Sequence, residues 1–231
     1  LYEPRGDEAP ERGVFVVVHG GGFVKGAKAS GRPYGLRMAR RGYVAVSIDY
    51  RLSQGQGPQR VLAAVSDARQ AIGWLQDNAA AYRLDAGHIA VGGSSAGAIT
   101  ALHLAYTDAA VDPGVEPARV AAVMDLWGGL YGRIEELGAG EAPLVIVHGT
   151  EDSTVPYSEA VALRDRAEQV GVPYAFHPIE GAGHAPFDPD QHVAWTARFF
   201  YDQVWAHGGG ATKILVPVAL ARWPIGPASG K

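Results

Sequence analysis

Two adjacent serines lie between glycines in the stretch Gly93–Gly97 (GSSAG). The stretch fits the pattern G-x-S-x-G with Ser95 at the centre, and we expect a strand before it and a helix after it. Such a sharp turn exposes the central hydroxyl above the edge of a sheet, because flanking glycines tolerate close approach and unusual dihedral angles. Ser95 is therefore a candidate nucleophile, with Ser94 as a small polar neighbour. Alone, the pattern also fits a phosphate-binding turn or a simple tight loop.

Two residues far downstream could activate this hydroxyl. A serine is a weak nucleophile near neutral pH and needs a base that is itself oriented by a carboxylate. Asp152, in the stretch HGTEDSTVP, and His184, in IEGAGHAPF, each follow an expected strand, and the order Ser, Asp, His is that of triads on parallel sheets. Glu151, next to Asp152, and Asp125, at the end of the preceding strand, are alternatives for the acid.

A run of glycines follows the first expected strand, within His19–Phe23 (HGGGF). Glycines have no side chains to block a substrate, so their N–H groups could approach a carbonyl oxygen. The N–H of Ala96, at the first turn of the helix after Ser95, is aimed at the same developing charge and is helped by the helix dipole. The two segments together predict an oxyanion hole, whereas the glycine run alone would also fit a flexible turn.

Short apolar runs alternate with longer stretches in which apolar residues recur every three or four positions. This pattern is typical of a parallel sheet with helices on both faces. We expect strands at Val14–His19, Tyr43–Asp49, His88–Gly92, Ala121–Leu126, Pro143–His148 and Tyr174–Ile179. We expect helices at Arg32–Arg41, Gln59–Tyr82, Ser95–Tyr106, Ser158–Val170 and Pro189–His207, three of them ended by Gly42, Gly171 and Gly208.

Composition excludes several classes of protein. The 231 residues are 47% apolar, which suits one domain with a real core. A net charge of −4 with scattered basic residues offers no surface for nucleic acid, and no apolar run is long enough for a membrane span. The absence of cysteine excludes disulfides and a thiol nucleophile. The eight histidines form no metal-binding motif, so we expect no metal and no cofactor.

The remaining histidines receive structural interpretations. His148 and His177 lie within expected strands and are interpreted as core or hydrogen-bonded residues. We expect the others at the surface of helices or strands: His88, His103, His192 and His207.

Five blocks of sequence together resemble the α/β-hydrolase superfamily, and within it carboxylesterases of the hormone-sensitive-lipase type and the neighbouring small feruloyl and acetyl esterases. The resemblance covers roughly residues 1–207. It rests on HGGGF, on SIDYRLS (Ser47–Ser53), on the stretch Asp67–Ala98, on HGTEDSTVP and on GAGH, in the order typical of these enzymes.

The resemblance implies a three-layer α/β-hydrolase sandwich and a serine esterase without cofactor. It implies that Ser95 is the nucleophile, that His184 is the base and then the acid, and that Asp152 orients His184. It further implies that backbone N–H groups of Gly21, Gly22 and Ala96 bind the oxyanion. His19, Asp49, Tyr50, Arg51 and Asp67 would brace the surrounding loops.

Two features depart from the resemblance. The chain begins near the second strand of the usual eight-stranded sheet, so we expect the N-terminal edge of the sheet to be open or covered by the tail at 208–231, whose role the sequence leaves undetermined. No large cap domain has a counterpart, because the stretch between the fourth and fifth strands has room for only a turn or two of helix. Leu1 shows no leader pattern, which means that a leader was removed or that the start lies upstream; the compartment stays open.

We expect a small-molecule ester as substrate, with short to medium acyl chains and aryl or sugar esters included, and a homo-oligomer is compatible with the sequence. The alternatives are an arylformamidase, a serine peptidase and a noncatalytic binding protein on the same scaffold. Residues that follow strand ends are candidates for contact with the substrate: Phe23, Ser94, Trp127, Leu130, Tyr131, Val155 and Phe187.

Overall fold

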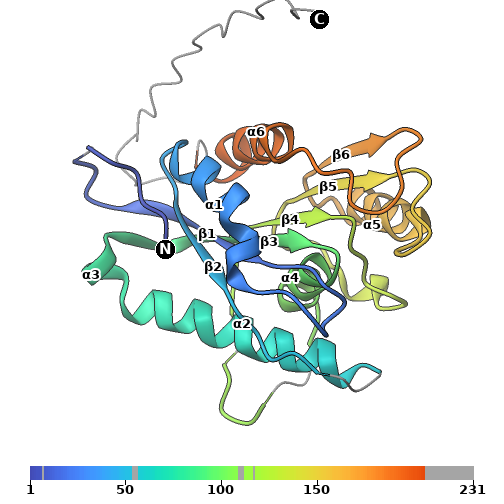
Figure 1. Cartoon of the computed structure of the whole chain (residues 1–231), viewed down its shortest axis with the longest axis horizontal. Coiled ribbons are helices and arrows are strands. Elements are labelled where there is room, and N and C mark those ends of the chain that lie inside the picture. The colour runs from blue at the N-terminus through green and yellow to red at the C-terminus, as the bar shows by residue number, and fades with distance from the viewer. Residues whose placement is uncertain (7, 54–56, 109–111, 117, 206–231) are drawn as a thin grey trace, which may run out of the picture.

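The computed structural model of the chain describes residues 1–6, 8–53, 57–108, 112–116 and 118–205 (Figure 1). The expected tail at 208–231, together with His207 and Gly208, lies outside the described residues. The described residues belong to the expected domain at 1–207.

A six-stranded sheet forms the centre of the molecule, with strand order β2-β1-β3-β4-β5-β6 and every neighbouring pair parallel. All six expected strands are confirmed, and the largest difference is that β3 begins four residues earlier than expected. The strands are β1 (Arg12–Val18), β2 (Val44–Ile48), β3 (Leu84–Ser94), β4 (Ala122–Leu126), β5 (Leu144–Gly149) and β6 (Tyr174–Ile179).

Helices cover both faces of the sheet, which gives the expected three layers (Figure 1). One face carries α2 (Gln59–Asp77), α4 (Ala96–Tyr106) and α5 (Tyr157–Val170). The other carries α1 (Arg32–Ala39) and α6 (Pro189–Phe200). Shorter helical turns are η1 (Lys28–Gly31), α3 (Ala79–Tyr82), η2 (Ile134–Glu136) and the π-helical turn η3 (Tyr201–Trp205). The fold is that of the α/β-hydrolases.

The apolar strands explain why the sheet is buried on both faces. Side chains of successive strand residues point to opposite faces, so an unbroken apolar run supplies two cores at once. In β1, Val14, Val16 and Val18 pack in the core under α2, α4 and α5. Phe15 and Val17 pack in the core under α1 and α6. Packing on both faces holds the strands in place and so fixes the positions from which the loops after them start.

Two expected helices end earlier than their periodicity indicates. The helix expected at 59–82 breaks at Asn78, where the backbone turns to φ −104° and ψ 11°, and the single turn α3 ends at Arg83 with a left-handed φ of 53°. The helix expected at 189–207 is α-helical only to Phe200 and continues as η3. Helical periodicity alone does not reveal such changes, because the apolar face continues through them.

The N-terminal edge of the sheet has a partner that the sequence did not predict. Tyr2 pairs antiparallel with Ala45 of β2: its N–H donates to the Ala45 carbonyl at 2.7 Å, and the Ala45 N–H donates to its carbonyl at 2.9 Å. The aromatic ring lies against the backbone of Gly35 in α1, where a side chain would overlap it. Part of this edge is therefore covered by residue 2.

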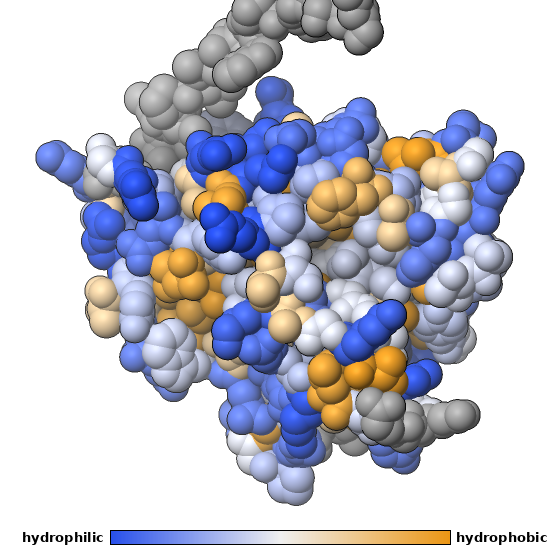
Figure 2. Space-filling model, viewed as in Figure 1, coloured by the Kyte–Doolittle hydropathy of each residue, from blue (hydrophilic) through white to orange (hydrophobic). Residues whose placement is uncertain are grey.

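The face seen in Figure 2 is mainly hydrophilic, with apolar side chains in separate patches. In the described part of the chain, none of the helices has the combination of length and apolar character that a membrane crossing requires. The large apolar side chains exposed on the described residues are Leu1, Leu52, Trp74, Tyr82, Tyr131, Phe187 and Tyr201.

Candidate active site

Ser95 occupies a strained turn between β3 and α4. Its backbone has φ 53° and ψ −120°, a conformation that residues other than glycine rarely adopt. The turn is held from both sides, because the Ser95 N–H donates to the Leu126 carbonyl and the Ser95 carbonyl accepts from the Ile99 N–H, each at 2.9 Å. These hydrogen bonds to β4 and α4 hold the Ser95 backbone in this conformation.

The glycines of the turn are required by the end of β1. A Cβ atom on Gly93 or on Gly97 would overlap the carbonyl oxygen of Val18. A Cβ atom on Gly20 would lie 2.8 Å from the Ser94 carbonyl oxygen and 3.5 Å from the Ser95 Cβ. The pattern in the sequence therefore has a steric reason: only residues without side chains let β1, β3 and α4 meet at this point.

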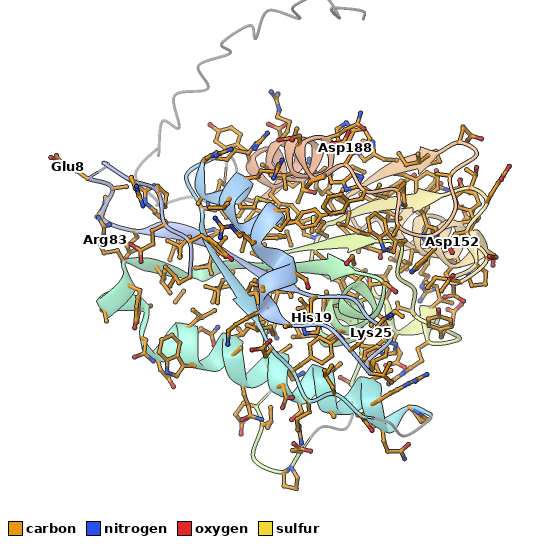
Figure 3. The ribbon with its side chains drawn as sticks, in the orientation of Figure 1. Glu8, His19, Lys25, Arg83, Asp152 and Asp188 are labelled. Carbon is orange, nitrogen blue, oxygen red and sulfur yellow. The ribbon has the colours of Figure 1, made fainter. Side chains whose placement is uncertain are left out.

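The structure brings Ser95, Asp152 and His184 together. The Nε2 atom of His184 lies 3.0 Å from the Ser95 Oγ, and its Nδ1 atom lies 2.7 Å from the Asp152 Oδ2. A carboxylate oxygen only accepts, so Nδ1 keeps its proton and donates a hydrogen bond to Asp152. Nε2 is then free to accept from the serine hydroxyl. The three residues come from the loops after β3, β5 and β6, and Figure 3 shows Asp152 where the chain leaves β5.

The loops that carry Asp152 and His184 are joined by their backbones. Gly149, at the end of β5, has no room for a Cβ atom because the carbonyl groups of Ala182 and Gly183 lie against it. The Glu151 N–H donates to the Ala182 carbonyl at 2.9 Å, so the acid loop is hydrogen-bonded directly to the histidine loop. This contact fixes the separation of the acid and the base.

The Asp152 carboxylate is fully buried and well supplied with donors. Its Oδ1 accepts from the N–H groups of Thr154 at 2.8 Å and Val155 at 3.0 Å. Burial acts to raise the pKa of Asp152, but the hydrogen bonds from His184 and from these two amides outweigh it and hold the pKa below its usual value. Asp152 is therefore ionised near neutral pH.

The alternatives for the acid make other contacts. Glu151 is exposed. Asp125 is buried, and its Oδ1 accepts from the Gly128 N–H at 2.7 Å, which ties the loop after β4 to the end of that strand. Burial raises the pKa of Asp125 to about 7. Asp152 is the carboxylate that contacts His184.

The glycine run forms a tight turn above the end of β1. Gly21 and Gly22 have φ values of 119° and 64°, and the N–H groups of Val24 and Lys25 both donate to the Gly21 carbonyl at 3.2 Å. A Cβ atom on Gly21 would overlap the Lys25 carbonyl, whereas one on Gly22 would meet open space. Ala96 directly follows Ser95 and begins α4. The assignment of these N–H groups to an oxyanion stays a prediction.

The expected bracing of the loops is confirmed. The His19 ring stacks on the Tyr50 ring with centroids 4.3 Å apart, and the Tyr50 hydroxyl donates to the His19 carbonyl at 3.0 Å. Burial raises the pKa of Tyr50 to about 12, so this hydroxyl keeps its proton. Asp49 accepts from the Lys28 backbone at 2.6 Å and from its Nζ at 2.7 Å. Arg51 donates from Nε to Asp67 at 2.8 Å.

The residues expected to contact substrate divide into two groups. Tyr131 and Phe187 are exposed, at 49% and 63% of their surface. Trp127 is buried, but its ring meets the His184 ring edge-to-face with centroids 6.5 Å apart. The other three apolar candidates are buried as well. Phe23 and Leu130 pack in the core under α2, α4 and α5, and Val155 lies in the loop that carries Asp152.

A small hollow of about 30 Å³ lies beside Ser94, the remaining candidate. It is bounded by Gly20 from the glycine run, by the turn η1, by α1 and by the ends of β3 and β4. The residues that define its shape are Gly20, Ser30, Gly31, Tyr34, Ser94 and Leu126. Gly20 and Ser94, two residues of its wall, are neighbours of Ser95, since a Cβ on Gly20 would lie 3.5 Å from the Ser95 Cβ.

Two of the histidine interpretations are wrong. His103 and His192, expected at the surface, are 7% and 1% exposed, because α4 is covered by α2 as well as by the sheet and His192 faces Tyr34 under α6. Burial lowers the pKa of each to about 4. His148, expected as a core or hydrogen-bonded residue with no link to the site, has its Nε2 3.2 Å from the Asp152 Oδ2. Its position four residues before Asp152 in HGTED was the signal that could have linked the two.

Within the described ranges, no three His, Asp or Glu side chains are grouped so that they could hold a metal ion.

Comparison with known proteins places this geometry in a family. Residues 1–130, more than half of the chain, match the BD-FAE family model. The chain belongs to the BD-FAE family. Residues 131–205 match the model of the prolyl oligopeptidase family. The predicted resemblance to α/β-hydrolases and to their carboxylesterases is confirmed.

Among curated relatives of this BD-FAE protein, esterase LipC of Mycobacterium tuberculosis is 26% identical over 74% of this chain and 52% of its own length. A probable isoprenylcysteine alpha-carbonyl methylesterase of Oryza sativa subsp. japonica is 28% identical over 80% of this chain and 54% of its own length. The chain spans about half the length of these relatives.

Solved structures of a thermophilic esterase from Thermogutta terrifontis share the fold. The form phosphonylated by cyclosarin superposes with a TM-score of 0.76 at 26% identity, covering 92% of this chain and 89% of that one. The propionate-bound form gives a TM-score of 0.77 at 24% identity, covering 87% of each chain.

Proposed function

We propose that this BD-FAE protein is a serine hydrolase of carboxylic esters that works through an acyl-enzyme on Ser95. The observation that carries the proposal is the chain of contacts from the Ser95 Oγ to His184 Nε2 at 3.0 Å and from His184 Nδ1 to Asp152 Oδ2 at 2.7 Å. The esterase names of the relatives and of the solved structures support the same reaction class.

The reaction has two halves. The Ser95 Oγ attacks the ester carbonyl while His184 Nε2 takes its proton, and the tetrahedral intermediate collapses when the imidazolium gives that proton to the leaving alcohol. Water then attacks the acyl-serine with His184 again as base, and the acid and free Ser95 are released. Asp152 stabilises the imidazolium in both halves and keeps Nδ1 protonated.

The negative charge of each intermediate would be bound by the backbone N–H groups of Gly21, Gly22 and Ala96. In another serine hydrolase, loss of one such donor costs about 3 kcal/mol of transition-state stabilisation. The proposal is supported by the rigid turn at Gly21 and by the position of Ala96 at the positive end of the α4 dipole.

The hollow beside Ser94 supports short acyl chains as substrates. The hollow is small, with walls that include Gly31, Tyr34 and Leu126, and this favours short acyl groups over long chains. The esterase from Thermogutta terrifontis has been solved with propionate and with butyrate bound, which supports the same class. Tyr131 and Phe187, both exposed, would contact the alcohol part of the ester.

The test is hydrolysis of p-nitrophenyl esters from C2 to C12 by the wild-type chain and two variants. Ser95→Ala should lower kcat by roughly 10⁶-fold, since nucleophile and base act as a unit. Ser94→Ala is the matched control and should stay within about tenfold of the wild type, because truncating a hydroxyl that is not attacked leaves the nucleophile in place. Wild-type activity in Ser95→Ala, or a maximum at C12, would contradict the proposal.

A further inference from the structure

His148 lies directly beneath the acid of the proposed triad. It is on β5, one residue before the strand ends, and its side chain has no exposed surface. Its Nε2 atom is 3.0 Å from the Val155 carbonyl oxygen and 3.2 Å from the Asp152 Oδ2. The chain turns back after Gly149, so the ring is enclosed by the loop that carries Asp152.

These contacts define the tautomer of the ring. Both neighbours of Nε2 are acceptors, so Nε2 must carry the proton. Nδ1, on the other side of the ring, is buried and has no hydrogen-bond partner among the described residues. A proton there would be an unpaired buried donor, which is unfavourable. Burial lowers the pKa of His148 in spite of the carboxylate beside it, in agreement with a neutral ring.

The His148 Nε2–H faces the same Asp152 oxygen that accepts from His184. Asp152 Oδ1 is bound by the two amides of its own turn, from Thr154 and Val155. Oδ2 is the oxygen that accepts from His184. The His148 N–H therefore holds the Val155 end of the turn and lies against the same oxygen that the catalytic base uses.

We propose that His148 is a positioning residue of this site: as a neutral donor it locks the turn from Asp152 to Val155 and shares the negative charge of the Asp152 oxygen that orients His184. The inference rests on the proposed function for its catalytic consequence. Its structural part, the coupling of His148 to Asp152 and His184, can be measured without any ester.

Other titratable groups around this carboxylate come from several elements. The Tyr157 ring, at the start of α5, meets the His148 ring edge-to-face with centroids 6.0 Å apart. Tyr131, in the loop after β4, has its pKa raised by burial and by the negative charges of Glu159, Asp152 and Asp125. None of these groups is removed when His148 is replaced, and the comparison of the Phe and Gln variants isolates the lost donor.

Replacing His148 by Phe removes the donor and keeps a flat ring. Without the donor, the Asp152 oxygen carries more negative charge and favours the protonated base, so the pH below which kcat/KM falls should move up by about half a unit. The turn is also held less firmly, and kcat should fall roughly tenfold with KM unchanged within twofold. His148→Gln can place an amide N–H near the position of Nε2 and should restore both the rate and the pH profile.

His177→Phe is the matched control. His177 is on the neighbouring strand β6 and stacks on Trp195 with centroids 4.0 Å apart, so this change also replaces a histidine ring by a benzene ring in the same sheet. It should leave the pH profile unchanged. If the Phe and Gln variants of His148 behave alike in rate and in pH profile, the ring only fills space and the proposal is wrong.

NMR of the wild type keeps the inference testable if the Phe variant does not fold or the chain hydrolyses no ester. Long-range ¹H–¹⁵N correlation should show His148 as the Nε2–H tautomer throughout the pH range in which the protein is folded. In His148→Gln, the His184 Nδ1–H resonance should be retained close to its wild-type position. A His148 ring that is protonated on Nδ1 would overturn the proposal, whereas inactivity of the wild type with this tautomer intact would overturn the proposed function alone.

Discussion

The carboxyl and amino ends of the strands differ in which residue types adopt a positive φ. Six non-glycine residues of the described chain have positive φ, and five of them follow the carboxyl ends of strands: Phe23, Ser95, Trp127, Tyr131 and Ala185. At the amino ends, positive φ before β2 and β6 occurs at Gly42 and Gly171, where glycine is the residue that adopts it without strain. Arg83, before β3, is the exception.

This contrast shows that backbone strain is concentrated at the carboxyl ends of the strands, where the candidate site lies. Each non-glycine residue in a left-handed conformation costs of order 1 kcal/mol or more and persists because its surroundings enforce it. At the carboxyl end, the enforced residues include the proposed nucleophile Ser95 and Trp127, whose ring contacts His184. Changes at this end should therefore reduce activity more than stability, and changes in the core should do the opposite.

The largest effect is expected from the acid. Asp152→Asn keeps the shape of the side chain but can donate to Nδ1 of His184, which favours the wrong tautomer and should lower kcat by roughly 10⁴-fold. Glu151→Gln is the matched control, since this neighbour is exposed, and should stay within twofold of the wild type. Steady-state kinetics on p-nitrophenyl acetate measure both, and equal losses would show that charge near the loop, rather than this carboxylate, matters.

A smaller loss is expected at the glycine run. Gly21→Ala places a Cβ atom against the Lys25 carbonyl and should displace the proposed oxyanion donors, with a loss of roughly 10²-fold to 10³-fold in kcat. Gly132→Ala is the control, because Gly132 also has positive φ, at 79°, but has open space around it. It should cost only about 1 kcal/mol in the free energy of unfolding. Full activity in Gly21→Ala would remove this loop from the mechanism.

The core should behave in the opposite way. Ile72 on α2 is fully buried beneath the sheet, far from the strand ends that carry the site. Ile72→Ala should lower the free energy of unfolding by about 2 to 5 kcal/mol, as measured by urea denaturation, and should leave kcat/KM of the folded protein within about twofold. Trp74→Ala, on the exposed face of the same helix, should cost much less. A large loss of kcat/KM in Ile72→Ala would contradict the expectation that core changes lower stability and leave activity unchanged.

The smallest effect is a pH dependence of stability at Asp125. The folded protein holds a proton on this buried carboxyl up to about pH 7, while in the unfolded chain its pKa returns to 3.8. The unfolded chain binds fewer protons in that interval, so stability contributed by Asp125 falls as the pH rises. Between pH 6 and pH 8 the wild type should lose roughly 1 kcal/mol relative to Asp125→Asn. A difference that is constant with pH would contradict the assignment.

Much of the fold could be predicted because it follows local rules. Apolar runs defined all six strands, and glycines such as Gly42 and Gly171 marked the ends of helices. The residues of the candidate triad could also be predicted, because strand ends of a parallel sheet lie on one edge and loops that follow them meet there.

What the sequence did not reveal depends on packing between distant segments. His103 is buried close to the charged groups of Arg133 and Glu136, and His192 is buried against Tyr34. The pairing of Tyr2 with β2 has no local pattern at all. The contact of His148 with Asp152 depends on the turn after β5, which folds the loop back over the strand.

The site of covalent labelling by a fluorophosphonate shows directly which serine is activated. A serine that is activated by His184 should react, and peptide mass spectrometry of the labelled wild type should place one adduct per chain on Ser95. Ser95→Ala should remain unlabelled and Ser94→Ala should be labelled as the wild type is. An unlabelled wild-type protein, or an adduct on Ser94, would contradict the account.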